Sequence, residues 1–181
     1  MATEAFAARG YNKASLAEIA DVAGVTQAGV LHHFRSKAQL LTSVLDLRDA
    51  TDIEQLGPER PRGLAFLRHL VDTARRNTER EGIVRLYAVL SAESVTDDHP
   101  AQEYFRARYA GLRAMVADAL AEACELGELP AATDLRDAAN AIIAVMDGLQ
   151  VQWLLAPAEV DMAASTDRVL GAVLAGLGHR G

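Results

Sequence analysis

Hydrophobic residues recur at helical spacing along most of the chain, and no stretch shows the alternation with a period of two that strands require. In residues 15–23 the apolar positions lie three and four residues apart, and Ser15 and Glu18 have the spacing of a capping box. Gly24 then interrupts the pattern, and a second apolar run occupies residues 26–34. The pattern predicts two short helices joined by a tight turn.

The joint between these helices has the residues of a helix-turn-helix. Gly24 is expected to adopt the left-handed backbone conformation that a tight turn needs, because it has no side chain to clash. Val25 and Val30 are expected to be buried against Ile19 and Phe34. A polar face is then left turned outward, as in the helix-turn-helix motif.

The rest of the chain reads as further helices. A short helix is expected to end at Gly10, with Phe6 as its apolar anchor, and another to begin at Ser36 and Gln39, which form a second capping box. The clearest linker is GPERPRG at residues 57–63, which contains two prolines and two glycines. Beyond it, helices are predicted near residues 64–74, 83–90, 100–127, 133–156 and 160–177.

Composition supports an all-α protein. Apolar residues make up 50% of the chain and aromatic residues only 5%, and Ala and Leu, which are strong helix formers, dominate the apolar share. Together with the turn at Gly24, this composition predicts an N-terminal helix-turn-helix domain over residues 1–47, with the linker shortly after it. A larger helical domain is predicted over residues 48–181.

The charge distribution limits where nucleic acid can bind. The net charge of −7 argues against a protein that coats nucleic acid, because such binding needs Lys and Arg to neutralise phosphates. Residues 1–50 hold five basic and five acidic side chains, so the remainder carries the whole negative charge. A neutral head on an acidic body is typical of a protein that touches DNA at one end.

No membrane partner is expected. The sequence has no run of 18 or more uninterrupted apolar residues, and its first residues lack the layout of a secretory signal. We therefore expect a cytoplasmic protein.

The second predicted helix has an N-terminal turn suited to reading bases. Thr26, Gln27, Ala28 and Gly29 are small or hydrogen-bonding, so they allow close approach to base edges. Gln27 has the amide that pairs bidentately with adenine, and Ala28 and Gly29 suit contact with a thymine methyl. The alternative, a polar face that only meets water, is equally compatible with this stretch alone.

Three basic or titratable side chains follow, where phosphate oxygens would lie: His32, His33 and Lys37. Adjacent histidines on a helix point about 100° apart and no carboxylate completes a ligand set, so no metal site is predicted.

The segment FAARGYNKASLAEIADVAGVTQAGVLHHFRSKAQLLTSVL resembles the DNA-binding domain of the TetR family of repressors. The likeness covers about 40 residues and includes GY after the first helix, the IADVAGV turn, HF at the end of the reading helix, and SKAQLL. It implies phosphate contacts from Ser15, His33 and Lys37, and base contacts from Thr26, Gln27 and Gly29. The family usually has tyrosine where this chain has Leu31, so the contact of that hydroxyl is expected to be absent or replaced by His32.

The stretches AVMDGLQVQWLLAP and EVDMAASTDRVL resemble the paired helices through which the family dimerises. Small Ala and Gly residues between the large ones permit close helix packing. The predicted homodimer interface consists of Val145, Leu149, Gln152, Trp153, Val169, Val173 and Leu177. Trp153 either anchors this interface or lines a pocket, and we favour the interface.

The resemblance implies that residues 1–47 form the helix-turn-helix DNA-binding domain and residues 48–181 the helical ligand-binding and dimerisation domain. It also implies a small-molecule effector, unknown and largely apolar, that releases the homodimer from a pseudo-palindromic operator in double-stranded DNA. Large aromatic and flexible side chains suit such a ligand. The candidates are Tyr87, Phe105, Tyr109, Met115 and Met146, and for each of them plain core packing is equally open.

Two other classes of function compete with a DNA-binding regulator. An enzyme is disfavoured because the sequence shows no Gly-rich phosphate loop, nucleophile elbow, zinc-ligand spacing or paired carboxylates in an apolar setting. No cofactor is expected. A helical interaction module that does not bind DNA is the second rival, favoured by the acidic net charge.

Overall fold

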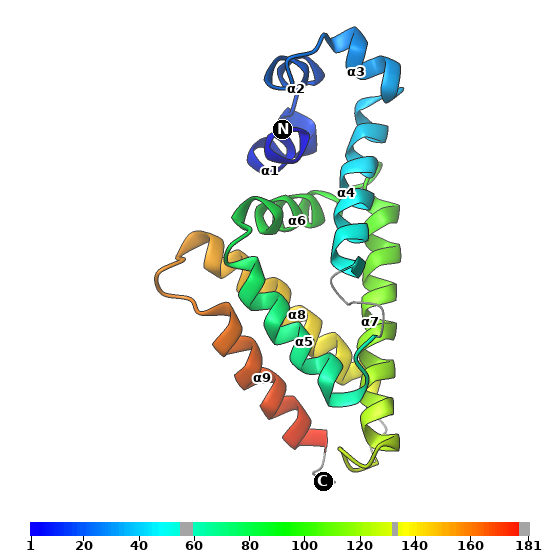
Figure 1. The fold of residues 1–181 in the computed structure, drawn as a ribbon, viewed down its shortest axis with the longest axis vertical. Coiled ribbons are helices and arrows are strands. Elements are labelled where there is room, and N and C mark those ends of the chain that lie inside the picture. Colours follow the sequence, from blue (N-terminus) through cyan, green and yellow to red (C-terminus); the bar gives the residue numbers. More distant parts are fainter. Residues whose placement is uncertain (55–59, 132–133, 178–181) are drawn as a thin grey trace. The chain divides into compact units, whose positions relative to one another are not determined.

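The computed structural model describes residues 1–54, 60–131 and 134–177, and these residues form only α-helices, joined by turns. Part of the expected linker at residues 57–63 lies outside the described residues. Thr133, at which a helix was expected to begin, also lies outside them. The helices, shown in Figure 1, are α1 (Ala2–Lys13), α2 (Leu16–Val22), α3 (Gln27–His33), α4 (Lys37–Glu54), α5 (Gly63–Asn77), α6 (Glu81–Glu93), α7 (Gln102–Glu125), α8 (Leu135–Leu155) and α9 (Met162–Leu177).

The chain folds into two compact units. One contains Met1–Pro58 and Gly82–Ala107, and the other contains Glu59–Glu81 and Arg108–Gly181. The all-α class is confirmed, and every predicted helix is present with ends shifted by a few residues. These packing units do not coincide with the two domains predicted on either side of residue 47. The predicted boundary separates regions of different function, and it stays a prediction.

In the first unit, α1 breaks at Gly10, where the sequence predicted its end, although a last turn continues to Lys13. Gly10 has φ of 69° and ψ of −179°. A Cβ built there would lie 1.9 Å from the Glu93 carboxylate, and that carboxylate accepts a hydrogen bond of 2.7 Å from the Tyr11 N–H. Glycine is required here by both its backbone conformation and the closeness of Glu93.

The α2–α3 turn is held by its backbone groups. Gly24 has φ of +68°, and its N–H bonds to the Asp21 carbonyl while the N–H of Val25 bonds to the Ala20 carbonyl, both at 3.0 Å. These two bonds make a Schellman motif, which ends a helix with a left-handed residue. The expected role of Gly24 is confirmed.

The prediction that Val25 is buried is wrong, because this side chain is 51% exposed. In a Schellman motif the residue after the left-handed glycine packs against a side chain in the last turn of the helix. Here that side chain belongs to Ala20, and its methyl group is too small to cover Val25. The joint is closed instead by Ile19 and Val30, which are 3% and 7% exposed, while Phe34 is half-buried.

In the second unit, α9 packs against α5 and α8, around a core that includes Phe66, Leu67, Ile142 and Met162. The start of α5 receives two carboxylates: Glu122 accepts from the Gly63 N–H at 3.2 Å and Glu128 from the Leu64 N–H at 2.9 Å. The bond from Gly63, and then Arg62, hold the pKa of Glu122 below its ordinary value. Negative charge at a helix N-terminus is favourable because the helix dipole is positive there.

Candidate nucleic-acid interface and ligand sites

The first turn of α3 presents the residues that the sequence assigned to base reading. Thr26, Gln27 and Ala28 are exposed and Gly29 is half-buried, whereas Val30 behind them is buried. The Thr26 hydroxyl oxygen accepts a hydrogen bond of 3.0 Å from the Gly29 N–H, so it caps the helix and keeps its own hydrogen for donation. The arrangement offers one amide, one hydroxyl and little bulk to an approaching surface.

Ser15 caps α2 in the same way, because its hydroxyl accepts from the Glu18 N–H at 3.2 Å. The predicted capping at the start of α4 is also present, since the Ser36 hydroxyl accepts from the Gln39 N–H at 3.1 Å. The Gln39 side chain then accepts from the N–H of Arg35 at 2.6 Å. In each of these three consecutive helices a side-chain oxygen therefore satisfies one of the N–H groups that the first turn leaves free, which stabilises the reading turn.

Lys37 has internal partners that the sequence did not predict. Its ammonium group donates to the carbonyls of Tyr11 at 2.8 Å and Ala14 at 3.0 Å, with Asn12 at 3.5 Å, and it lies 4.3 Å from the centre of the Tyr11 ring. Lys37 thus ties the start of α4 to the last turn of α1 and to Ala14, which follows it. The predicted phosphate contact of Lys37 stays a prediction.

His32 and His33 are both exposed at the end of α3, and their rings meet edge to face at 5.3 Å. Leu31, beside them, is 39% exposed. An apolar side chain therefore occupies the surface position at which the sequence predicts that a hydroxyl contact is absent. Within the part of the chain that the structure describes, no three metal-ligating side chains come together.

Two of the predicted effector residues are packed in the first unit. Tyr87 is 8% and Phe105 3% exposed, and their rings meet at 5.6 Å. The Tyr87 hydroxyl donates to Asp49 at 2.7 Å, which also accepts from Tyr104 at 2.5 Å, and the Arg48 guanidinium lies 3.7 Å over the Tyr87 ring. This cluster joins α4, α6 and α7. It is what core packing, the alternative to ligand binding, predicts for Tyr87 and Phe105.

The other three predicted effector residues, Tyr109, Met115 and Met146, are half-buried in the second unit. Sequence reasoning missed Asp147, next to Met146. Burial raises the pKa of the Asp147 carboxyl, while a hydrogen bond from Tyr109 and the charge of Arg108 act in the opposite direction. A carboxyl group inside the apolar run AVMDGL was the available signal, because buried acids in apolar surroundings are uncommon without a purpose.

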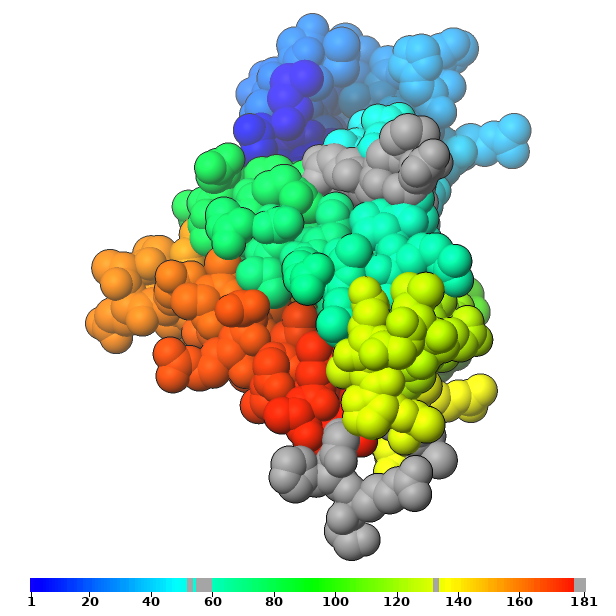
Figure 2. Space-filling view, turned by 60° about the horizontal axis from the view of Figure 1, so that its bottom comes forward, coloured from blue at the N-terminus to red at the C-terminus, as the bar shows by residue number. Residues whose placement is uncertain are grey.

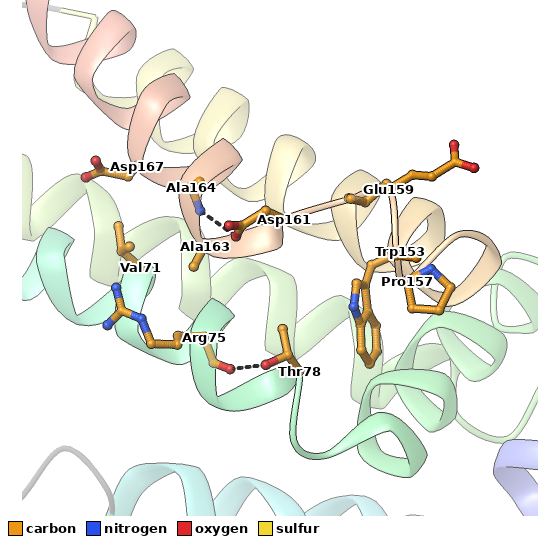
Figure 3. A pocket seen from close by; sticks show the side chains of 12 residues that line it. Val71, Arg75, Thr78, Trp153, Pro157, Glu159, Asp161, Ala163, Ala164 and Asp167 are labelled. Atoms are coloured by element: carbon orange, nitrogen blue, oxygen red, sulfur yellow. Dashed lines mark hydrogen bonds between the residues drawn. The ribbon is translucent and has the colours of Figure 1, made fainter.

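The second unit also has an open pocket of about 730 Å³ that none of the five predicted effector residues lines. Its lining includes Trp153, which is only 7% exposed within a single chain. Such burial leaves little of this side chain for a second subunit or a ligand to cover, and the predicted interface role of Trp153 stays a prediction. Its side chain stands beside Pro157 in Figure 3.

The remaining interface candidates lie on α8 and α9. Val145, Leu149, Val169, Val173 and Leu177 are half-buried, and Gln152 is exposed. Val151 and Leu155, both on α8, are 47% and 82% exposed. Figure 2 shows α9, in orange to red, open to the surface along its length.

The helix α8 is long and apolar enough to cross a membrane by length and composition alone. Only 22% of its most apolar stretch of 18 residues is buried within the chain. An apolar helix with so little cover is also what a subunit interface requires.

Comparison with known proteins covers both halves of the chain. Residues 1–44 match the family described as bacterial regulatory proteins, tetR family, and residues 59–178 match the family described as BetI-type transcriptional repressor, C-terminal. Two relatives from Pseudomonas putida are the HTH-type transcriptional regulator TtgR and the probable HTH-type transcriptional regulator ArpR. Each is 30% identical over 179 residues, which cover 92% of this chain and 83% of the relative.

The fold has solved counterparts. The transcriptional regulator FadR from Bacillus subtilis, in complex with stearoyl-CoA, superposes with a TM-score of 0.78 at 21% sequence identity, covering 97% of this chain and 95% of that one. The matches in sequence and in fold therefore extend over more than nine-tenths of the chain.

Proposed function

The chain belongs to the TetR family of bacterial transcriptional regulators, and from this premise we propose that it is a cytoplasmic repressor that binds a pseudo-palindromic operator as a homodimer and leaves it when a small molecule binds. The observation that carries the proposal is the exposed first turn of α3, which Thr26 caps and which follows the left-handed Gly24 at the end of α2. A rigid support with small polar side chains is what direct reading of base edges requires.

In this proposal Gln27 pairs with adenine, and Thr26, Ala28 and Gly29 contact neighbouring base edges. Ser15, His33 and Lys37 bind phosphates, with His32 in place of the hydroxyl that the chain lacks at Leu31. Lys37 acts in part through its bonds to the carbonyls of residues 11–14, which keep α1 and α4 together while the N–H groups at the start of α4 face the phosphate.

The dimer forms through α8 and α9 of each subunit, as a four-helix interface. The support for it is the apolar, largely uncovered surface of α8. A two-fold dimer places two reading helices on successive major grooves only if they are about 34–36 Å apart. An effector acts by favouring another spacing, because a ligand with equal affinity for both states shifts nothing.

The effector is proposed to bind near Tyr109, Met115 and Met146 in the second unit, with Asp147 at the polar end of the site. These side chains offer apolar area and one carboxyl group whose raised pKa favours a hydrogen-bonding role. The FadR of the same fold, which is in complex with stearoyl-CoA, supports a ligand with a large apolar part.

The test is fluorescence anisotropy of the protein with DNA from the upstream region of its own gene at low salt. We expect a saturable rise in anisotropy that persists when competitor DNA of unrelated sequence is added. Flat anisotropy would contradict the proposal. Replacing Gln27 with Ala should cost about 1–3 kcal/mol at one base-pair position. The control is Val95→Ala, a neutral change at a 79% exposed position of the same unit outside the reading turn, and it should leave the affinity unchanged.

A further inference from the structure

The reading helix α3 exposes one large apolar side chain. Leu31 is 39% exposed, whereas Val30, which closes the joint with α2, is 7% exposed. Exposed leucines are common on protein surfaces, and most of them need no explanation. Leu31 differs from the others because it belongs to the helix whose outer side is proposed to meet base edges.

Leu31 shares its side of α3 with the residues proposed to read bases. Since α3 turns by about 100° per residue, Leu31 points between Gln27 and Ala28 when seen along the helix axis, about 40° from the first and about 60° from the second. It lies about 6 Å farther along the axis than Gln27. Gln27 and Ala28 are both exposed. The three side chains therefore form one continuous surface, which begins with an amide and ends with an isobutyl group.

The chemistry of leucine limits what this end of the surface can contact. A leucine side chain has no donor or acceptor, so it cannot bind a phosphate oxygen or pair with a polar base edge. If it covered such a group, it would displace water without replacing the hydrogen bonds of that water, which is unfavourable. In the major groove, the apolar group that base edges present is the C5-methyl of thymine. Thymine is therefore the base that suits Leu31.

We propose that Leu31 is a specificity-determining residue, which contacts the C5-methyl group of a thymine in each half-site of the operator. This inference rests on the proposed binding of the operator through α3, and it adds a base preference that Gln27 does not supply. Because Leu31 lies about one helical turn beyond Gln27, the thymine belongs to a base pair within about two steps of the adenine that Gln27 reads.

The test removes single methyl groups from the DNA, because deoxyuridine pairs as thymidine does and lacks only the C5-methyl. The operator that the full-length protein selects in vitro is resynthesised with deoxyuridine at one symmetric pair of thymines at a time. Binding is then measured by fluorescence anisotropy. We expect one pair, near the adenine assigned to Gln27, at which the affinity falls about fivefold or more, since each half-site loses an apolar contact.

Variants assign this effect to its side chain. Leu31→Ala should weaken binding of the unmodified operator to a similar extent, and deoxyuridine at that pair should then weaken it less than twofold further, because the contact is already missing. An effect at another thymine, which Ala28 contacts, should persist in this variant. Leu31→Met keeps a flexible apolar side chain and should retain most of the deoxyuridine penalty.

The matched control is Leu47→Ala, which removes the same atoms at a 70% exposed position of α4. It should leave both the affinity and the deoxyuridine penalty unchanged. Circular dichroism should show the same helix content in all three variants, because Leu31 and Leu47 are exposed.

The outcomes separate this inference from operator binding itself. An operator that is bound but has no thymine near that adenine, or is insensitive to deoxyuridine there, would overturn the role of Leu31 and leave the proposed function intact. A full deoxyuridine penalty in Leu31→Ala would overturn it as well. So would an equal loss of affinity for the operator and for unrelated DNA, which would place Leu31 on the sugar–phosphate backbone. Failure of the wild-type protein to select any operator would contradict the proposed function, and this inference with it.

Discussion

The α2–α3 turn exposes polar side chains on a backbone whose helix ends are capped, whereas α8 exposes apolar side chains on a helix with little cover in its own chain. The first arrangement is complete within a single subunit and needs only DNA to act. The second is unfinished, because exposed Val151 and Leu155 gain stability when another surface covers them. The difference separates what one chain completes by itself from what a second copy completes in the proposed function.

The largest effect is expected where the first unit depends on a glycine. Gly10→Ala forces a side chain into positive φ and against the Glu93 carboxylate, so the free energy of unfolding should fall by about 2–3 kcal/mol. Thermal denaturation should show a melting temperature lower by roughly 5–10 °C.

The matched control is Gly82→Ala in α6, where an added Cβ meets nothing within 4 Å. It should stabilise the helix by about 0.5–1 kcal/mol. If both substitutions had the same effect, the collision with Glu93 would not be real.

The second prediction tests the unfinished surface. Val151→Glu places a charge on the α8 face that is 47% exposed in one chain, and burying it in a dimer would be costly. Sedimentation velocity should show a dimer dissociation constant raised at least tenfold. Val95→Glu, at a position that is 79% exposed in the first unit, should leave the dimer intact, and a dimer insensitive to Val151→Glu would place the interface elsewhere.

A smaller effect is expected from the cap of the reading helix. Thr26→Ala removes the acceptor for the Gly29 N–H, which should cost about 1 kcal/mol of stability and weaken operator binding. Thr26→Ser keeps the hydroxyl and should retain most of both properties in urea denaturation and anisotropy. Equal losses in the two variants would mean that the methyl group, not the cap, matters.

The smallest expected effect concerns Asp147 in the second unit. Its pKa is raised above the ordinary 3.8 by burial, so ionisation is harder in the folded protein and destabilises it. This cost is full above the folded-state pKa and vanishes as the pH falls below the ordinary value. Asp147→Asn, which still accepts from Tyr109, should therefore melt higher than wild type at pH 7, and the difference should disappear near pH 3.5.

Asp118→Asn, at an exposed position of α7, should melt like wild type across this pH range. A pH-independent difference between Asp147→Asn and wild type would contradict the raised pKa.

The reading turn was predictable because its signals are local. Ser15, Gly24 and Thr26 act on backbone groups within five residues of themselves, so the sequence carries their role directly. Val25 shows the limit, since its burial depends on the size of the residue that the turn brings opposite, which spacing alone does not reveal.

The second unit was harder to predict because its sites depend on distant partners. The pocket that Trp153 lines draws on α5, α8 and α9. Lys37 likewise contacts carbonyls more than 20 residues away. Helical periodicity predicts which side of a helix is apolar, and it does not tell whether that side meets a core, a ligand or a second subunit.

The most direct measurement is in vitro selection of DNA by the full-length protein from a random library at low salt, followed by sequencing. A dimer that reads with Gln27 should enrich an inverted repeat whose half-site centres lie one helical turn, or a multiple of it, apart. The Gln27→Ala protein should lose the preference at one symmetric pair of positions. Failure to enrich any sequence, or enrichment of a single half-site without symmetry, would contradict operator reading by a dimer.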